Sequence, residues 1–369
     1  MTHNGEDVPG YRTVRIGASD EPVEALADVA AWTAREAYPK ILSAGGPVFG
    51  IAREREQGGW ELHPYFVNFQ PQAARDALAM TLRQLATEAR ERGEHTGAAE
   101  YERAAGRLDW EPLNEVAVLG ERYRVVRGER FIRSGPDGPE PPRPTDPDPA
   151  GPDDGVRTPD PAAGFVLDPV RPTGMSEGIL KVELLGLTPV AGAVPADVRR
   201  DALLVTASHP GGVLLPVGFM AAELVDGRWE PVPPNHGNTP QQIRESLALG
   251  LRVIDPVTRG LDPDERAEYA EAAERWESER PVEVEVGGRR LRVVRVERLV
   301  RFGPDGPESP RPSDPDTELP FLAQEELLCA QGDFPREDGD PFDPGEAVLE
   351  MSRLMREEEE RRRARRERG

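Results

Sequence analysis

One 27-residue motif occurs twice in the chain, and the fold prediction starts from it. Residues 122–148 read RYRVVRGERFIRSGPDGPEPPRPTDPD and residues 290–316 read RLRVVRVERLVRFGPDGPESPRPSDPD, with 20 of 27 positions identical and no gap. Matches continue upstream in the same order, because residues 71–85 align with 240–254 and residues 98–108 align with 266–276. The sequence therefore predicts two copies of one unit of about 130 residues. This period is far longer than that of a solenoid repeat.

Each copy contains the same predicted elements. A helix at 22–38 or 195–207 is followed by two extended segments, at 47–54 and 60–67 or at 213–225 and 228–232. Next comes an amphipathic helix, since apolar residues recur on one helical face. These residues are Ala74, Leu78, Leu82 and Leu85 in the first copy and Ile243, Leu247, Leu251 and Ile254 in the second. A shorter helix is predicted at 97–108 and 264–276.

A hairpin ends each unit. Val282, Val284 and Val286 alternate as in a strand, and Gly287-Gly288 can form a two-residue turn with positive φ. The order α-β-β-α-α-β-β predicts an α+β fold, in which antiparallel sheets carry helices packed on one face. Two copies in tandem predict a pseudo-twofold molecule. Whether the two sheets join into one stays open. Gly45-Gly46 and Gly211-Gly212 are interpreted as stops between a helix and a strand.

The predicted division of the chain follows changes in composition. Repeat unit 1 is 10–133, a Pro- and Asp-rich linker is 134–163, and 164–302 is repeat unit 2 with a preceding connector. A Pro-rich, acidic segment at 303–345 and a charged helix at 346–369 complete the chain. Proline restricts φ and lacks an N–H, so the linkers are expected to be extended. We expect each PRP segment to lie as a strap along its own domain; the alternative is docking into an aromatic groove of a partner.

The C-terminal helix is predicted from its charges. Glutamates at 357–359 precede arginines at 361–363 by four residues, which favours ion pairs on a helix. The simplest interpretation is a solvated helix. The alternative is a docking helix for an acidic partner or for the acidic surface of this protein itself.

Composition excludes several classes of protein. The 369 residues carry a net charge of −22 and include 39 prolines, so the chain is acidic and proline-rich. It contains no apolar run long enough to predict a membrane-spanning segment. The charge disfavours nucleic acid as a partner, except through the basic C-terminal end. Cys329 is the only cysteine, and the N-terminus MTHNGEDVPGYR lacks the pattern of a signal peptide. We therefore expect a cytoplasmic protein with no membrane partner.

A row of arginines is the main candidate site. Arginines recur every three residues at 124–133 and at 292–301. Guanidinium groups bind carboxylate and phosphate bidentately, which suggests a site for an anionic ligand. Its candidate residues are Arg127, Arg130, Arg133, Arg295, Arg298 and Arg301. The structural alternative is that a spacing of three places them on alternating faces of a strand, where Glu129, Glu297 and the acidic loops form ion pairs with them.

No other motif predicts chemistry. The histidines at positions 3, 63, 95, 209 and 236 lack metal-ligand spacing and are expected at the surface. The acidic runs DPDPAGPDDG and DGDPFDP lack the calcium-loop pattern, and no P-loop, dinucleotide, G-x-S-x-G or zinc-peptidase motif occurs. We predict no catalytic residue, no metal and no cofactor. The leading hypothesis is a non-enzymatic protein that binds another protein; the alternative is a ligand-binding protein or enzyme with an anionic small molecule held between the repeats by arginines.

The chain also resembles a known family. The resemblance rests on EAYPKIL, GPVFGIARERE, FVLDPVRPTGMSEG at 165–178 and the repeated GPDGPExPRP[ST]DPD motif. They are similar to an uncharacterised family from high-GC actinobacteria, catalogued as a domain of unknown function. The resemblance covers most of the chain except the tail. It implies a bacterial cytoplasmic protein and adds no activity, cofactor or catalytic residue.

Overall fold

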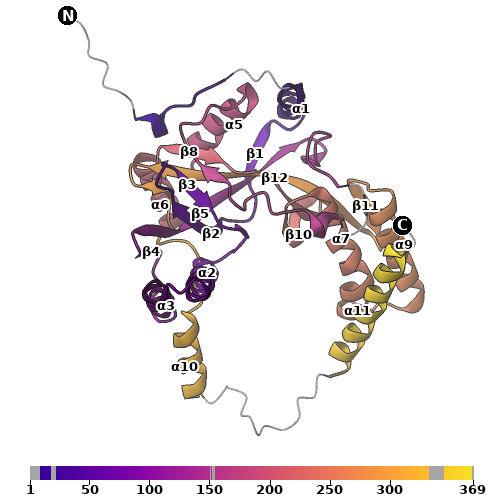
Figure 1. Cartoon of the computed structure of the whole chain (residues 1–369). Helices are drawn as coiled ribbons and strands as arrows, with labels where there is room; N and C mark the ends of the chain where they lie inside the picture. The colour runs from indigo at the N-terminus through magenta and orange to yellow at the C-terminus, as the bar shows by residue number, and fades with distance from the viewer. Residues whose placement is uncertain (1–8, 18–21, 150, 152–153, 332–344, 368–369) are drawn as a thin grey trace, which may run out of the picture.

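The computed structural model describes residues 9–17, 22–149, 151, 154–331 and 345–367. Within this part of the chain the strands form one sheet of 13 strands, whose central order is β10-β9-β12-β5-β2-β3-β7. Every pair of named strands is antiparallel. The helices surround this sheet (Figure 1). The predicted α+β class is confirmed.

The two halves contain their elements in a similar order. The first half consists of a 3-10 turn (Gly10–Arg12), α1 (Pro22–Ala37), β1 (Lys40–Ser43), β2 (Val48–Glu54), β3 (Trp60–Leu62), α2 (Pro71–Glu91), α3 (His95–Leu108), β4 (Glu115–Val118), β5 (Glu121–Gly135) and β6 (Gly138–Pro139). The connector and second half consist of α4 (Asp154–Arg157), β7 (Val166–Leu167), α5 (Met175–Gly186), α6 (Ala196–Ser208), β8 (Gly211–Leu214), β9 (Gly218–Val225), β10 (Arg228–Gly237), α7 (Pro240–Leu249), a π-helical turn (Gly250–Ile254), α8 (Asp255–Thr258), α9 (Pro263–Ser278), β11 (Glu283–Val286), β12 (Arg289–Gly303) and β13 (Gly306–Pro307). Two helices follow, α10 (Phe321–Gln331) and α11 (Gly345–Arg366).

The two longest strands join the halves. β5 and β12 pair over four residues, and Arg130 is the Cα partner of Arg298 within this short ladder. On either side of it each long strand keeps its own hairpin partner, β4 for β5 and β11 for β12. The single sheet answers the question that the sequence left open, because the two hairpins meet edge to edge at their middle residues.

Helices cover the sheet in three places (Figure 1). Leu78 and Leu82 of α2 pack with Tyr123 of β5, and α3 packs alongside α2. In the second half α7 and α9 bury Trp276 against Leu291 and Val293 of β12. Between these two groups, α5 lies over the junction of the halves. There its Leu180 and Leu184 contact Phe131 of β5 and Leu299 of β12.

Both predicted amphipathic helices form, but one residue of the second helix does not lie on the predicted apolar face. In α2 the residues Ala74, Leu78 and Leu82 are fully buried, as predicted. In the second half Ile254 is 46% exposed, although it was predicted on the apolar face. The π-helical turn at Gly250–Ile254 explains the difference, because this wider turn ends on Ile254 and shifts its side chain away from the apolar face set by α7.

The hairpin and glycine predictions need two corrections. Val284 and Val286 are buried, but Val282 precedes β11 and is exposed. Gly287 and Gly288 have the positive φ of the predicted turn. Gly211 and Gly212 begin β8 itself rather than ending a helix, whereas Gly45 and Gly46 connect β1 to β2 with positive φ.

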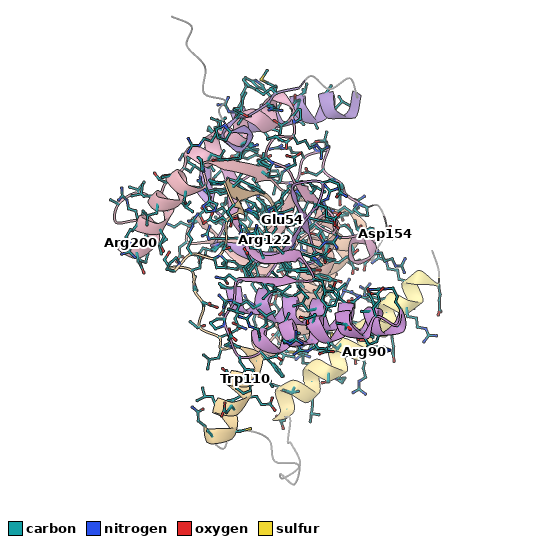
Figure 2. The ribbon with its side chains drawn as sticks, turned by 60° about the vertical axis from the view of Figure 1, so that its left-hand side comes forward. Glu54, Arg90, Trp110, Arg122, Asp154 and Arg200 are labelled. Carbon is teal, nitrogen blue, oxygen red and sulfur yellow. The ribbon has the colours of Figure 1, made fainter. Side chains whose placement is uncertain are left out.

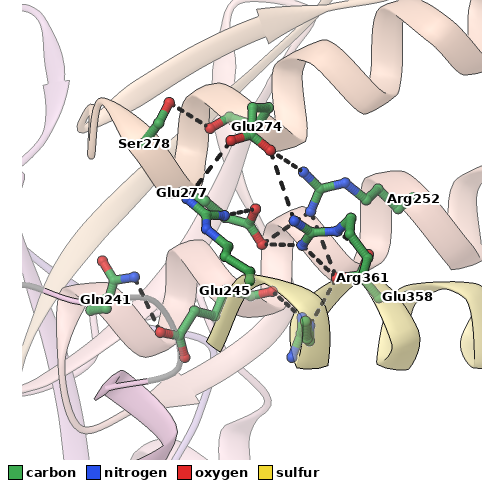
Figure 3. A network of polar contacts seen from close by, with 10 residues as sticks. Gln241, Glu245, Arg252, Glu274, Glu277, Ser278, Glu358 and Arg361 are labelled. Carbon is green, nitrogen blue, oxygen red and sulfur yellow. Dashed lines mark hydrogen bonds and ion pairs between the residues drawn. The ribbon is translucent and has the colours of Figure 1, made fainter. Parts of the chain in front are cut away.

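The C-terminal helix binds the protein's own acidic surface. Arg361 and Arg365 of α11 each donate to the buried carboxylate of Glu277 on α9, at 2.7 Å (Figure 3). Arg252 also pairs with Glu277, at 3.0 Å. Of the three predicted i,i+4 pairs, Glu358–Arg362 forms, at 2.8 Å. Arg361 instead reaches Glu358 and Glu277, so the docked alternative, rather than a solvated helix, describes α11.

Candidate functional site

The repeated motif forms a turn and then a strap on the opposite half. After β5, Gly138 adopts a φ of +105° and packs against Trp229, which belongs to the second half. After β12, Gly306 adopts a φ of +113° and packs against Trp60 of the first half. The prediction that each strap lies along its own domain is therefore wrong. The turn directs each strap across the junction.

The glutamate of each motif ties the two long strands together through its backbone. Glu140 donates its N–H to Arg133 of β5 and accepts from the N–H of Arg295 of β12, both at 2.9 Å. Glu308 does the same between Arg301 and Arg127, also at 2.9 Å in both bonds. Each strap thus supplies backbone hydrogen bonds to both strands at the place where β5 and β12 no longer pair directly.

The side chains of the straps satisfy arginines of the opposite half. Arg127 binds Asp314 through Nε at 2.9 Å, and Arg295 binds Asp146 at 3.1 Å. One step further along the straps, Asp316 pairs with Arg75 and Asp148 with Arg244. All of these partners are distant in sequence. Aspartates at aligned positions of the two straps therefore make equivalent contacts with arginines of the opposite half.

Ion pairs account for most of the arginine row. All eight arginines are at most 9% exposed, so the prediction of a shared open site fails for most of them. Arg124 pairs with Glu115, Arg292 with Glu283, Arg133 with Glu183, and Arg301 with Glu129. Burial raises the pKa of Glu129, but the opposing charges of Arg301, Arg311 and Arg127 are stronger and hold that pKa below its ordinary value. At the edge of the sheet, Arg122 pairs with Glu54 at 3.1 Å (Figure 2).

Arg130 and Arg298 are the exceptions. Among the described residues neither guanidinium forms an ion pair. Arg130 donates to the carbonyl oxygens of Gly46 and Asn235, and Arg298 donates twice to that of Pro216. Burial lowers the pKa of each guanidinium to about 10. Of the six candidate residues, only this pair keeps a charge that no carboxylate neutralises.

A large cavity has a different position. It has a volume of about 820 Å³ and lies between α1, α5, β8 and the segment from Phe165 to Gly174. Two predicted residues, Arg133 and Arg295, line it together with Glu297 and with Arg143 of the first strap. These charged groups are already neutralised, because Arg143 and Arg295 both contact Glu297 and Arg133 binds Glu183. The apolar part of the cavity wall includes Leu180, Leu214 and Trp32.

Lys181 is a buried cation of this cavity wall without an ion-pair partner among the described residues. It projects from α5, is 3% exposed and lines the cavity wall. Its Nζ donates to the carbonyl oxygen of Pro169 at 3.4 Å and forms no ion pair with any described residue. Burial lowers the pKa of Lys181, although Glu177 and Asp168 partly oppose this shift. The arrangement can hold an anionic group next to an apolar wall.

Lys181 was not among the predicted site residues, although the sequence contained a signal for it. The chain has 46 lysine and arginine side chains in total, and Lys40 and Lys181 are the only lysines among them. Lysine is therefore conspicuous where arginine is the default. No comparable signal marked His236, which is only partly exposed and lies near Arg298, contrary to the prediction of a surface histidine. Burial, reinforced by Arg298, lowers its pKa to about 3.

A grouped metal site and a membrane-spanning helix are both absent from the described part of the chain. Within 9–17, 22–149, 151, 154–331 and 345–367, no three His, Cys, Asp or Glu side chains are grouped so that they could hold a metal ion. The acidic run DGDPFDP and His3 lie outside these ranges. In the same part of the chain, no helix has both the length and the apolar character needed to cross a bilayer.

Comparison with known proteins identifies a family without an assigned activity. No curated protein and no solved structure matches the chain. The model of a family of unknown function, DUF5954, matches residues 21–317. This range contains both long strands, both straps and most of the residues that line the cavity, and it ends directly after the second motif. The chain therefore belongs to the DUF5954 family of unknown function.

Proposed function

We propose that this protein binds a small organic acid in the cavity beneath α1 and α5, with Lys181 as the group that receives the acid. The observation that carries the proposal is a buried lysine on a cavity wall without an ion-pair partner among the described residues. An ammonium group loses solvation when it is buried, and an anionic ligand restores the lost interaction. This proposal develops the ligand-binding alternative and moves its site away from most of the arginines.

The shape of the cavity narrows the ligand class. Its volume of about 820 Å³ is within the range of small-molecule sites, roughly 300–1,000 Å³. Leu180, Leu214 and Trp32 favour an apolar body, whereas Lys181 favours a carboxylate or phosphate at one end. Arg133, Arg143 and Arg295 of the wall already have carboxylate partners, so we expect Lys181 to be the main contact of the acidic group.

The chain offers a matched pair of variants for testing this. Monocarboxylates with alkyl or aromatic bodies are added to the full-length protein, and the melting temperature is measured for wild type, Lys181→Met and Lys40→Met. Lys40 is exposed at the start of β1, so its variant removes the same charge away from the cavity. At least one acid is expected to stabilise wild type and Lys40→Met but not Lys181→Met.

A second readout follows the amine directly. With ¹³C-labelled lysine only two side-chain signals are expected, and Lys181→Met assigns them. A bound carboxylate should raise the pKa of Lys181, because it stabilises the ammonium form. Stabilisation that persists in Lys181→Met, or an unchanged Lys181 titration in the saturated complex, contradicts the proposal.

We also infer that the two halves descend from one duplicated unit and are related by an approximate twofold axis between Arg130 and Arg298. Support comes from the aligned motifs and from the equivalent contacts of Asp146 and Asp314. The actinobacterial origin and the cytoplasmic location remain predictions.

Protein binding is a second candidate function. Leu26, Val29 and Trp32 form an exposed apolar row along α1, with exposed fractions of 63%, 64% and 45%. Apolar rows of this kind favour contact with a partner. Photo-crosslinking from position 29 in cells should capture one defined protein if α1 is an interface. Val29→Glu should then abolish that product without changing the response to acids.

A further inference from the structure

We infer that Arg130 and Arg298 together hold a small inorganic anion of the halide class at the junction of the two halves. This inference is independent of the cavity at Lys181. It rests on the position of the two guanidinium groups, on their burial and on the hydrogen-bond donors that they leave unused.

The position comes from the sheet register. Arg130 and Arg298 are directly opposite each other in the four-residue ladder of β5 and β12. Opposite residues of an antiparallel pair project their side chains to the same face of the sheet. Two positive charges are therefore placed on the same face of the sheet where the halves meet, and neither forms an ion pair with an acid among the described residues.

Burial makes this arrangement costly without a counter-charge. Arg130 is 4% exposed and Arg298 is 1% exposed. Removing a charged group from water is unfavourable by several kcal/mol unless another charge compensates for it. The other six arginines of the two rows have carboxylate partners, and these two have carbonyl oxygens instead. Carbonyl dipoles satisfy some donors but leave the net charge in place.

Each guanidinium retains unused donors. Among the described residues, Nη2 of Arg130 and Nη1 of Arg298 have no hydrogen-bond acceptor. The nearest influence of opposite sign on Arg298 is Asp160, which raises its pKa but forms no ion pair with it. Asp160 is itself held by the N–H of Tyr65 at 2.6 Å and by that of Ala162 at 2.9 Å. The backbone thus keeps the carboxylate away from the arginines.

Two glycines leave room beside the pair. A Cβ at Gly45 would lie 3.6 Å from Nη2 of Arg130, and a Cβ at Gly218 would lie 3.6 Å from both Nε of Arg298 and Cε1 of His236. Neither arginine lines the cavity at Lys181. The space that each missing Cβ leaves has about the size of one small group, which favours a small ion over an organic ligand. His236 is neutral at physiological pH, because its pKa is about 3, and adds no further positive charge.

The test compares anions at equal ionic strength. Sodium bromide is expected to raise the melting temperature of the full-length protein by about 2–4 °C relative to sodium methanesulfonate, whose anion is larger than bromide. Crystals grown with bromide should show anomalous density between the guanidinium groups of Arg130 and Arg298. Bromide density confined to the surface, or no difference between the two salts, overturns the inference.

Variants separate this site from general salt effects. Arg130→Gln and Arg298→Gln should each abolish the bromide-dependent shift. Arg301→Gln lies on the same strand but loses an ion pair with Glu129, so it should lower stability and keep the shift. Lys181→Met should also keep it, which distinguishes failure here from failure of the proposed acid site. Gly218→Ala is a milder variant that should reduce the bromide-dependent shift in melting temperature. An equal shift in wild type and Arg298→Gln contradicts the inference.

Discussion

Arg127 and Asp314 are 187 residues apart in the chain, and the Nε–H of Arg127 donates to both carboxylate oxygens of Asp314, at 3.0 and 2.9 Å. Their side chains are 8% and 5% exposed, so the pair is buried. It connects the middle of β5 to the strap that follows β12. Equivalent contacts between Arg295 and Asp146 connect β12 to the other strap. The halves are therefore held by exchanged segments as well as by a shared sheet.

The first prediction concerns this exchange. Asp314→Asn should lower the free energy of unfolding by about 3 kcal/mol, because breaking a buried pair leaves Arg127 with less compensation. Urea unfolding measures the change. The control is Glu100→Gln, which removes an exposed pair with Arg103 and should change stability by about 0.5 kcal/mol or less. Equal effects of the two variants would show that the strap contact contributes no more than a surface pair.

A second prediction concerns the motif glycine. Gly306→Ala should destabilise the protein by about 3 kcal/mol, since a φ of +113° strains an L-residue and the new Cβ would overlap the Trp60 ring. The matched control is Gly106→Ala in α3, where a Cβ meets nothing within 4 Å. That variant should stabilise the helix by about 0.5–1 kcal/mol. Thermal unfolding of both variants decides between a packing role and a purely local turn.

A third prediction concerns α11. Glu277→Gln should release the C-terminal helix, because its carboxylate receives Arg252, Arg361 and Arg365 (Figure 3). Limited proteolysis should then cleave near 345–367 faster than in wild type. The control Glu350→Gln removes an exposed contact with Arg266 and should leave most of the protection in place. Unchanged cleavage in Glu277→Gln would mean that apolar contacts hold the helix.

A fourth prediction concerns pH. The pKa of His236 is about 3 in the folded protein and about 6.5 when unfolded, so below pH 6.5 the unfolded state binds the extra proton. Its contribution to stability is present above pH 6.5 and is lost as pH falls towards 3, at up to about 1.4 kcal/mol per pH unit. The slope of unfolding free energy between pH 6.5 and 5 should therefore decrease in His236→Asn. The pKa values of His63 and His209 are also lowered by burial, so these two histidines should leave a residual slope in the variant.

A fifth prediction concerns the amine of the cavity. Titration of the ¹³C-labelled lysine signals in the ligand-free protein should give Lys181 a pKa below the ordinary 10.5, because burial disfavours its charged form. The signal that disappears in Lys181→Met is the one to follow. A value at or above 10.5 would show that an anion already neutralises the amine or that water reaches it.

Most secondary structure could be predicted, because it depends on local patterns. The apolar spacing of Ala74, Leu78 and Leu82 and the glycine pair after β11 are both read within a few residues. Ile254 was placed wrongly, since the π-helical turn that contains it departs from the 3.6-residue period on which the prediction relied. For the candidate site, the sequence identified Arg130 and Arg298 among six arginines but gave no reason to separate them from the paired ones.

The sequence by itself determined the two related hairpins, the helices beside them and the turns that end β5 and β12. These depend on periodicity, on glycine at positive φ and on proline, all of which act over short distances. Only the tertiary structure decided that the sheets join at Arg130 and Arg298, that each strap crosses to the other half and that Lys181 lies on a cavity wall. Those outcomes depend on which buried charge meets which carboxylate, and local sequence does not encode a partner that is 187 residues away.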